Sequence, residues 1–234
     1  MSETLVSADV LLLVVAPYVA AVVFAIGVVE RLRRHPYSCT SHSTQLLENR
    51  QHFWTVVPFH YGLLAVLLLH AVAFLAPSAV IAWNRSPSRL YALEIAALAA
   101  GLLATGGLLG AVRRRAGVPL VRQATAAFDW IVYAVLLAQF ATGIAIAIRS
   151  SWGSAWMASV AAPYLWSLLR LRPDIGAVGA LPLLVKAHIG SAFVLLAVFP
   201  FSRLIHVISV PNAYLWRRPL VVRWYRRRSA SSEV

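Results

Sequence analysis

Residues 54–76 read WTVVPFHYGLLAVLLLHAVAFLA, an apolar run whose only ionisable side chains besides one tyrosine are two histidines, His60 and His70. A helix needs about 20 apolar residues to cross the hydrocarbon core of a membrane, and this run is long enough. Its side chains are continuously apolar and do not alternate with polar ones, which favours a helix over a strand of a membrane barrel. The stretch therefore predicts a transmembrane helix.

The rest of the chain has the same character. Of its 234 residues, 60% are hydrophobic and 12% are charged, and the mean hydropathy is +0.74, whereas soluble domains carry about 25% charged residues. Four further apolar runs are long enough to span, at about 10–29, 90–112, 124–148 and 183–210. We therefore expect an all-α integral membrane bundle of five transmembrane helices in a single domain, 1–234. The aromatic-rich segment 149–182 is expected to lie at the membrane interface.

The net charge of +13 is distributed by side of the membrane. Basic residues gather after the first span, after the third span and in the C-terminal tail, within 31–50, 113–122 and 217–228. The positive-inside rule then places the N-terminus outside and the C-terminus in the cytoplasm. Because membrane topology accounts for this charge, we expect no nucleic-acid-binding function.

Histidines are the candidate metal ligands of the spans. The single cysteine, Cys39, excludes an intrachain disulfide and an all-cysteine metal site. Four of the seven histidines lie within the second and fifth spans: His60, His70, His188 and His206. Ionisable side chains within a span are costly and usually functional, so these four are the candidate site.

The topology predicts how the four histidines pair. The second and fifth spans run in opposite directions, which brings His60 toward His206 at the cytoplasmic side and His70 toward His188 at the outer side. Ten residues of helix cover about 15 Å and eighteen cover about 27 Å, so the two spacings differ by about 12 Å. In one continuous helix over 183–210, His188 and His206 would share a face. The tilt of the helices would then have to account for the difference of about 12 Å between the two spacings.

Two imidazoles facing each other suit the axial positions of a haem iron. A six-coordinate iron has no open position for a substrate and favours electron transfer. Arg203 and Lys186, close to two of the histidines, are candidate partners for haem propionates, with snorkelling to the interface as the alternative. Spacing alone leaves open a haem-free metal site, transporter or proton channel built from the same histidines.

The third span is rich in glycine. Small residues allow helix backbones to approach closely within lipid. We expect this face to pack against a neighbouring helix, with approach to a haem face as the alternative use. The glycines are Gly101, Gly106, Gly107 and Gly110.

Residues 199–215, FPFSRLIHVISVPNAYL, closely resemble the corresponding stretch of the gamma subunit of respiratory nitrate reductase, a membrane cytochrome b. PYVAAVVFAIG at 17–27 is similar to the first span of that family. STQLLENR at 43–50, PFHYG at 58–62 and LAP at 75–77 also agree, so the resemblance covers nearly the whole chain.

This resemblance implies two haem b groups, one held by His60 and His206 near the cytoplasm and one by His70 and His188 near the outer face. It implies oxidation of membrane quinol near the outer haem, in a prokaryotic cell membrane. Electrons would pass to the iron–sulfur beta subunit and on to the molybdenum alpha subunit that reduces nitrate. The family has a basic residue near the start of the third span that is implicated in quinol binding, and Arg89 is the nearest one here. Arg89 and His70 are therefore the quinol-site candidates.

The resemblance also suggests a use for the basic residues on the cytoplasmic side. The arginines at 113–115 and the tail at 217–228 are a candidate docking surface for the beta subunit, and the ordinary positive-inside excess explains them equally well. Two rivals remain. One is a related two-haem cytochrome of another reductase, of the sulfite or heterodisulfide type. The other is the haem-free transporter or proton channel.

Overall fold

Five long helices form the body of the molecule in the computed structural model, which describes residues 8–34, 44, 47, 50–150 and 153–208. Each is long and apolar enough to cross a membrane. Within these described residues there is no strand, so the all-α, five-span prediction is confirmed. The helices are α2 (Ala16–Arg34, preceded by the π-helical turn η1, Leu11–Val15), α3 (Arg50–Leu75), α5 (Pro87–Gly117), α7 (Ala127–Arg149) and α11 (Leu183–Val198).

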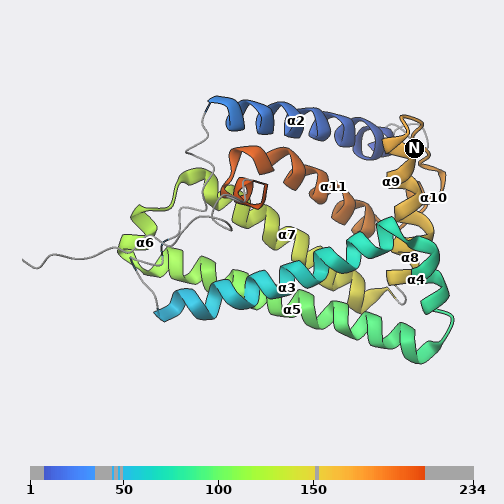
Figure 1. Cartoon of the computed structure of the whole chain (residues 1–234), viewed down its shortest axis with the longest axis horizontal. Helices are drawn as coiled ribbons and strands as arrows, with labels where there is room; N and C mark the ends of the chain where they lie inside the picture. The colour runs from blue at the N-terminus through green and yellow to red at the C-terminus, as the bar shows by residue number, and fades with distance from the viewer. Residues whose placement is uncertain (1–7, 35–43, 45–46, 48–49, 151–152, 209–234) are drawn as a thin grey trace, which may run out of the picture.

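Short helices cover the two ends of this bundle (Figure 1). One end, here called the α4 end, carries the connections after α3 and α7. The other end, here called the α6 end, carries the connection between α5 and α7. The short elements are α4 (Pro77–Trp83), α8 (Gly153–Trp156), η3 (Met157–Ala161), α9 (Ala162–Leu169) and α10 (Gly176–Gly179) at the α4 end, and α6 (Pro119–Gln123) at the α6 end.

The long helices pack in a chain of neighbours. α3 packs against α5, α5 against α7, α7 against α11, and α11 against α2 (Figure 1). α7 therefore lies between the helix pair α3 and α5 and the helix α11. This arrangement leaves α3 and α11 facing each other across the interior.

Glycines set the close approach of α3 and α5. A Cβ added at Gly62 would lie 2.5 Å from the backbone nitrogen of Ala104, and one added at Gly107 would overlap the backbone nitrogen of Phe59. At these two positions no larger residue fits without separating the helices. The packing role expected for the glycine-rich third span thus holds for Gly107, whereas a Cβ at Gly106 would meet nothing within 4 Å.

The fifth span is not one continuous helix, and the prediction of a helix over 183–210 was wrong. α11 ends at Val198 and is followed by two 3₁₀ segments, η4 (Phe199–Phe201) and η5 (Arg203–Val207). Between them Ser202 is extended, with φ −102° and ψ 176°. Pro200 lacks the backbone N–H that an α-helix needs and crowds the preceding turn, so the helix stops here. His188 and His206 therefore do not share one face of one helix.

Arg31 of α2 and Ser202 at the break itself hold this geometry in place. Arg31 of α2 donates from Nη1 to the carbonyl oxygens of Pro200 (2.6 Å) and Ser202 (2.8 Å). The Ser202 hydroxyl accepts the N–H of Leu204 at 3.1 Å, which caps the start of η5. The direction in which the chain leaves α11 is thus fixed by contacts, and this direction determines where His206 lies.

Candidate functional site

The four histidines form two facing pairs. His60 of α3 faces His206 of η5, with ring centroids 6.4 Å apart and ring planes 60° apart. His70 of α3 faces His188 of α11 at the same centroid distance, with planes 43° apart. These are the partners that the antiparallel topology predicts. The first pair lies toward the α6 end and the second toward the α4 end.

Backbone carbonyls fix the proton position in three of the four rings. A carbonyl oxygen can only accept, so the ring nitrogen beside it carries the proton. The other nitrogen, Nε2, then keeps its lone pair, which is the form that binds a metal ion. The contacts are His60 Nδ1 to the Val56 oxygen (2.8 Å), His70 Nδ1 to the Val66 oxygen (2.8 Å) and His206 Nδ1 to the Arg203 oxygen (2.6 Å).

The fourth ring, His188, is held by two side chains of α7. Its Nδ1 lies 2.9 Å from Thr142 Oγ1, and that hydroxyl donates its own proton to the Ala138 carbonyl at 2.8 Å. The hydroxyl therefore accepts from Nδ1–H. His188 Nε2 lies 3.2 Å from the amide nitrogen of Gln139, which donates to it, while Gln139 Oε1 accepts the hydroxyl of Ser191. All four histidines thus share one tautomer, assigned from their hydrogen bonds.

Sequence reasoning missed Gln139 and Thr142. Both are uncharged polar residues in the mainly apolar middle of α7, three positions apart and therefore on one face of this helix. That spacing was the available signal. It could not show which neighbour the face meets.

Each pair has the separation expected for two ligands of one metal ion. An imidazole nitrogen binds a metal at about 2 Å and lies about 1 Å from its ring centre, so two opposed ligands have centroids about 6 Å apart. The observed 6.4 Å fits. No group of three or more histidine, cysteine or acidic side chains suited to a metal ion occurs in the described part of the chain. A macrocycle that supplies its own four nitrogens needs only the two axial ligands that each pair offers.

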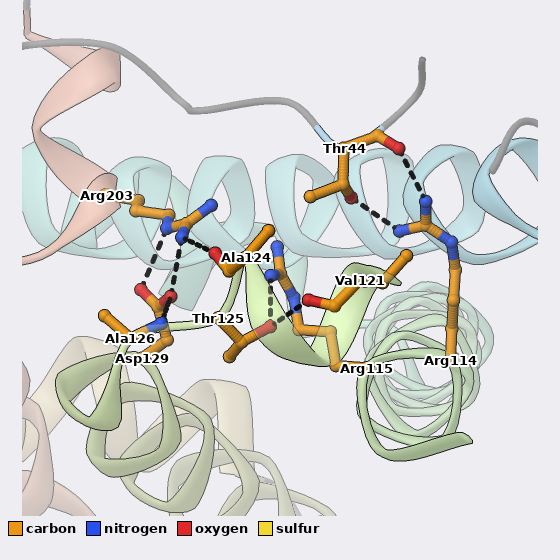
Figure 2. Close-up of polar contacts among 9 residues, drawn as sticks. All are labelled: Thr44, Arg114, Arg115, Val121, Ala124, Thr125, Ala126, Asp129 and Arg203. Atoms are coloured by element: carbon orange, nitrogen blue, oxygen red, sulfur yellow. Dashed lines mark hydrogen bonds and ion pairs between the residues drawn. The ribbon is translucent and has the colours of Figure 1, made fainter. Parts of the chain in front are cut away.

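The two cations proposed as propionate partners have acidic partners of their own. Arg203 donates from Nε to Asp129 Oδ1 at 2.9 Å, and its Nη2 lies 2.8 Å from Asp129 Oδ2 (Figure 2). Lys186 Nζ lies 2.9 Å from Asp9 Oδ1. Contact of either cation with a propionate stays a prediction, and any such contact would have to share these groups.

The quinol-site candidates both lie toward the α4 end. The Arg89 guanidinium lies over the ring of Trp83, 5.4 Å from its centroid, and Trp83 Nε1 donates to the Arg89 carbonyl at 3.0 Å. His70 is exposed on the surface of α3, whereas the other three paired histidines are partly buried. Both candidates are exposed on the surface of the bundle, and their role at a quinol site stays a prediction.

Part of the proposed docking surface at the α6 end is turned inward. Arg114 is 3% exposed and donates to Thr44 Oγ1 (2.8 Å) and to the Thr44 carbonyl (2.9 Å) (Figure 2). Arg115 donates to Thr125 Oγ1 at 3.1 Å. These two arginines hold Thr44 and the turn after α6. Cys39 and the basic tail 217–228 lie outside the described residues.

Comparison with known proteins gives a consistent family. Residues 9–225 match the family model described as nitrate reductase gamma subunit. The chain is 31% identical over 219 residues to the nitrate reductase gamma chain of Bacillus subtilis (strain 168), covering 92% of this chain and 96% of that one. It is 29% identical over 214 residues to the respiratory nitrate reductase 1 gamma chain of Escherichia coli (strain K12), covering 88% and 93%. It is also 28% identical over 218 residues to the nitrate reductase-like protein NarX of Mycobacterium tuberculosis (strain ATCC 25618 / H37Rv), covering 89% of this chain and 33% of that one.

Proposed function

The chain belongs to the nitrate reductase gamma subunit family, and from this we propose that it is the di-haem cytochrome b of a respiratory nitrate reductase, oxidising membrane quinol. One observation of the structure carries the proposal. Two pairs of histidines, at two levels of a membrane bundle, have their ring centroids 6.4 Å apart. Every Nε2 is unprotonated, and that of His188 accepts a hydrogen bond from Gln139 that a metal ion would have to replace. Membership of the family supports the proposed partners, and the geometry of the histidines supports the proposed haem binding.

In this proposal His60 with His206, and His70 with His188, each hold one haem b. Haem held by these histidines would supply a one-electron carrier at each level. The chain's own residues orient the ligands. Carbonyls of α3 and η5 hold three rings, and Thr142 holds the fourth, so each imidazole is fixed before it binds.

The quinol side is proposed to be the α4 end and the outer face of the membrane. Quinol oxidation releases two electrons and two protons, so the site needs hydrogen-bonding groups that hold the hydroxyls and a path that lets the protons leave. Arg89 and His70 are the proposed contacts at that end. Electrons leave at the α6 end, toward the iron–sulfur beta subunit and the molybdenum alpha subunit. The positive-inside rule supports an N-terminus outside and a C-terminus in the cytoplasm, and the proposed membrane is that of a prokaryotic cell.

The direct test is a reduced visible spectrum with haem quantitation on the purified chain. We expect two haems b per chain and the α-band of low-spin, six-coordinate haem after dithionite reduction. Protein that is folded but colourless when purified from haem-replete cells would contradict the proposal and favour a haem-free transporter or channel. Copurification with soluble nitrate reductase subunits would separate this function from that of a related cytochrome of another reductase.

Thr142→Val tests the hydrogen bond behind His188. Losing the acceptor at Nδ1 makes this imidazole a weaker electron donor, which destabilises the oxidised iron relative to the reduced iron. If the ratio of the affinities of His188 for oxidised and for reduced iron falls about three- to tenfold, the midpoint potential of this haem rises by roughly 30 to 60 mV. A redox titration followed in the α-band measures the shift, and the other haem should stay at its wild-type potential.

Thr105→Val is the matched control for this experiment. Thr105 is also a membrane-span threonine, and its hydroxyl donates to a carbonyl four residues back, that of Gly101, at 2.7 Å. Among the described residues it is not hydrogen-bonded to a histidine. An equal shift in both variants would show that the potential does not depend on the hydrogen bond to His188.

A further inference from the structure

The residue that faces His60 lies on a very short element. η5 consists of five residues, Arg203–Val207, in a 3₁₀ conformation, entered from the extended Ser202. An isolated turn of this length is unstable without tertiary contacts, because helix nucleation is costly and 3₁₀ geometry is poor. The position of His206 must therefore be set by what η5 touches, whereas His60 and His70 lie within a long helix.

The strongest described contact of η5 is an ion pair with α7. Arg203 and Asp129 meet in a two-point arrangement, with Nε 2.9 Å from Oδ1 and Nη2 2.8 Å from Oδ2 (Figure 2). The Asp129 side chain is 9% exposed. Two-point pairing of a guanidinium with a carboxylate fixes orientation as well as distance. The pair therefore defines how η5 is turned relative to α7.

Both partners of this pair are themselves held in place. Asp129 Oδ2 also accepts the backbone N–H of Ala126 at 2.9 Å, at the start of α7. Arg203 Nη2 also donates to the carbonyl of Ala124 at 2.9 Å. The carboxylate and the guanidinium are thus anchored to the same turn that leads into α7 (Figure 2).

The backbone of Arg203 connects this anchor to the ligand. Its carbonyl oxygen lies 2.6 Å from Nδ1 of His206, which donates to it. The same residue is therefore fixed by Asp129 through its side chain and orients the imidazole through its carbonyl. We propose that Asp129 is a positioning residue for His206, setting the place and ring orientation of this ligand through Arg203. This inference rests on the proposed haem-binding function, and it gives Arg203 a structural role.

Asp129→Asn is the variant that tests the inference. It keeps the shape and one oxygen that can accept the Ala126 N–H, but it removes the charge and the two-point pairing with Arg203. In the purified holoprotein we expect the haem of His60 and His206 to bind about tenfold more weakly and to have a changed midpoint potential. The haem of His70 and His188 should behave as in wild type. Hydrogen exchange should also become faster in the peptide that contains 203–207.

Two further variants give the necessary comparisons. Asp9→Asn breaks an ion pair of the same kind, with Lys186, at the other end of the bundle, where the side chains are 26% and 15% exposed. It should leave the His60/His206 haem unchanged. Asp129→Glu keeps the carboxylate and should retain most of the wild-type haem binding, which also provides a readable variant if Asp129→Asn does not fold.

The outcomes separate the two proposals. Asp129→Asn could retain two haems with wild-type midpoint potentials and wild-type hydrogen exchange in the peptide that contains 203–207. This result would overturn the positioning role and leave the proposed function intact. Equal loss of both haems in Asp129→Asn, or the same loss in Asp9→Asn, would also overturn it, because the effect would then be general instability. A wild-type protein without haem would overturn the proposed function and this inference together.

Discussion

His206→Ala is expected to remove one of two haems and to leave the other. The two histidine pairs share only the helix α3, and each pair draws its second member from a different part of the chain, η5 or α11. Removing His206 would leave His60 as the one histidine of that pair and so weaken binding of that haem, while His70 and His188 would still hold the other. The haem content of the purified chain should fall from two to one.

His60→Ala should give the same spectrum as His206→Ala, and His188→Ala should remove the other haem. His52→Ala is the control on the same helix, because His52 belongs to neither pair. Redox titration of each variant identifies which haem remains. Two haems retained in both His60→Ala and His206→Ala would contradict the pairing, and loss of both haems in every variant would show that the two sites do not fold independently.

The pairing of the histidines could be predicted because it depends on direction and depth alone. Antiparallel spans bring His60 level with His206 and His70 level with His188, whatever the details of packing. The spacing between the histidines is ten residues in the second span and eighteen in the fifth. Direction and depth could not explain this difference, because the comparison assumed that the fifth span is one continuous helix. In the structure the fifth span is interrupted: α11 ends at Val198, and the chain enters η5 after Ser202.

Pro200 was visible in the sequence, but its consequence was not. A proline in a membrane helix can produce a kink or an end, and neighbouring groups decide between them by satisfying the freed backbone atoms. Here Arg31 of α2 caps the carbonyls of Pro200 and Ser202, more than 160 residues away in the chain. Such a contact between distant segments leaves no periodic pattern in the sequence.

The polar partners of the site were hidden for the same reason. Arg203 could be recognised as a cation beside His206, and the expected partner was a propionate. The structure pairs it with Asp129 across 74 positions of sequence. Burying a charge without a partner is costly, so a nearby acid was a physical requirement, but only the packing of η5 on α7 identifies which acid supplies it.

Gly107→Val is expected to disrupt the bundle and both histidine pairs. A Cβ at this position would overlap the backbone nitrogen of Phe59, next to His60, and backbone atoms cannot move aside as a flexible side chain can. α3 would have to move away from α5, and α3 carries one histidine of each pair. Overpacking typically costs about 1–3 kcal/mol, and a clash against backbone lies at the upper end of that range or beyond it. Gly62→Val, on the opposite side of the same contact, should have the same effect.

Gly106→Val is the matched control, since it is the same substitution one residue away in the same helix. A Cβ at Gly106 would meet nothing within 4 Å, so this variant changes helix propensity equally without the clash. Haem content and thermal stability in detergent should be near wild type for Gly106→Val, whereas Gly107→Val should lose both haems and unfold at a lower temperature. If both variants keep two haems, the separation of α3 from α5 is not controlled by Gly107. If both lose them equally, the cause is the valine in the helix and not the contact with α3.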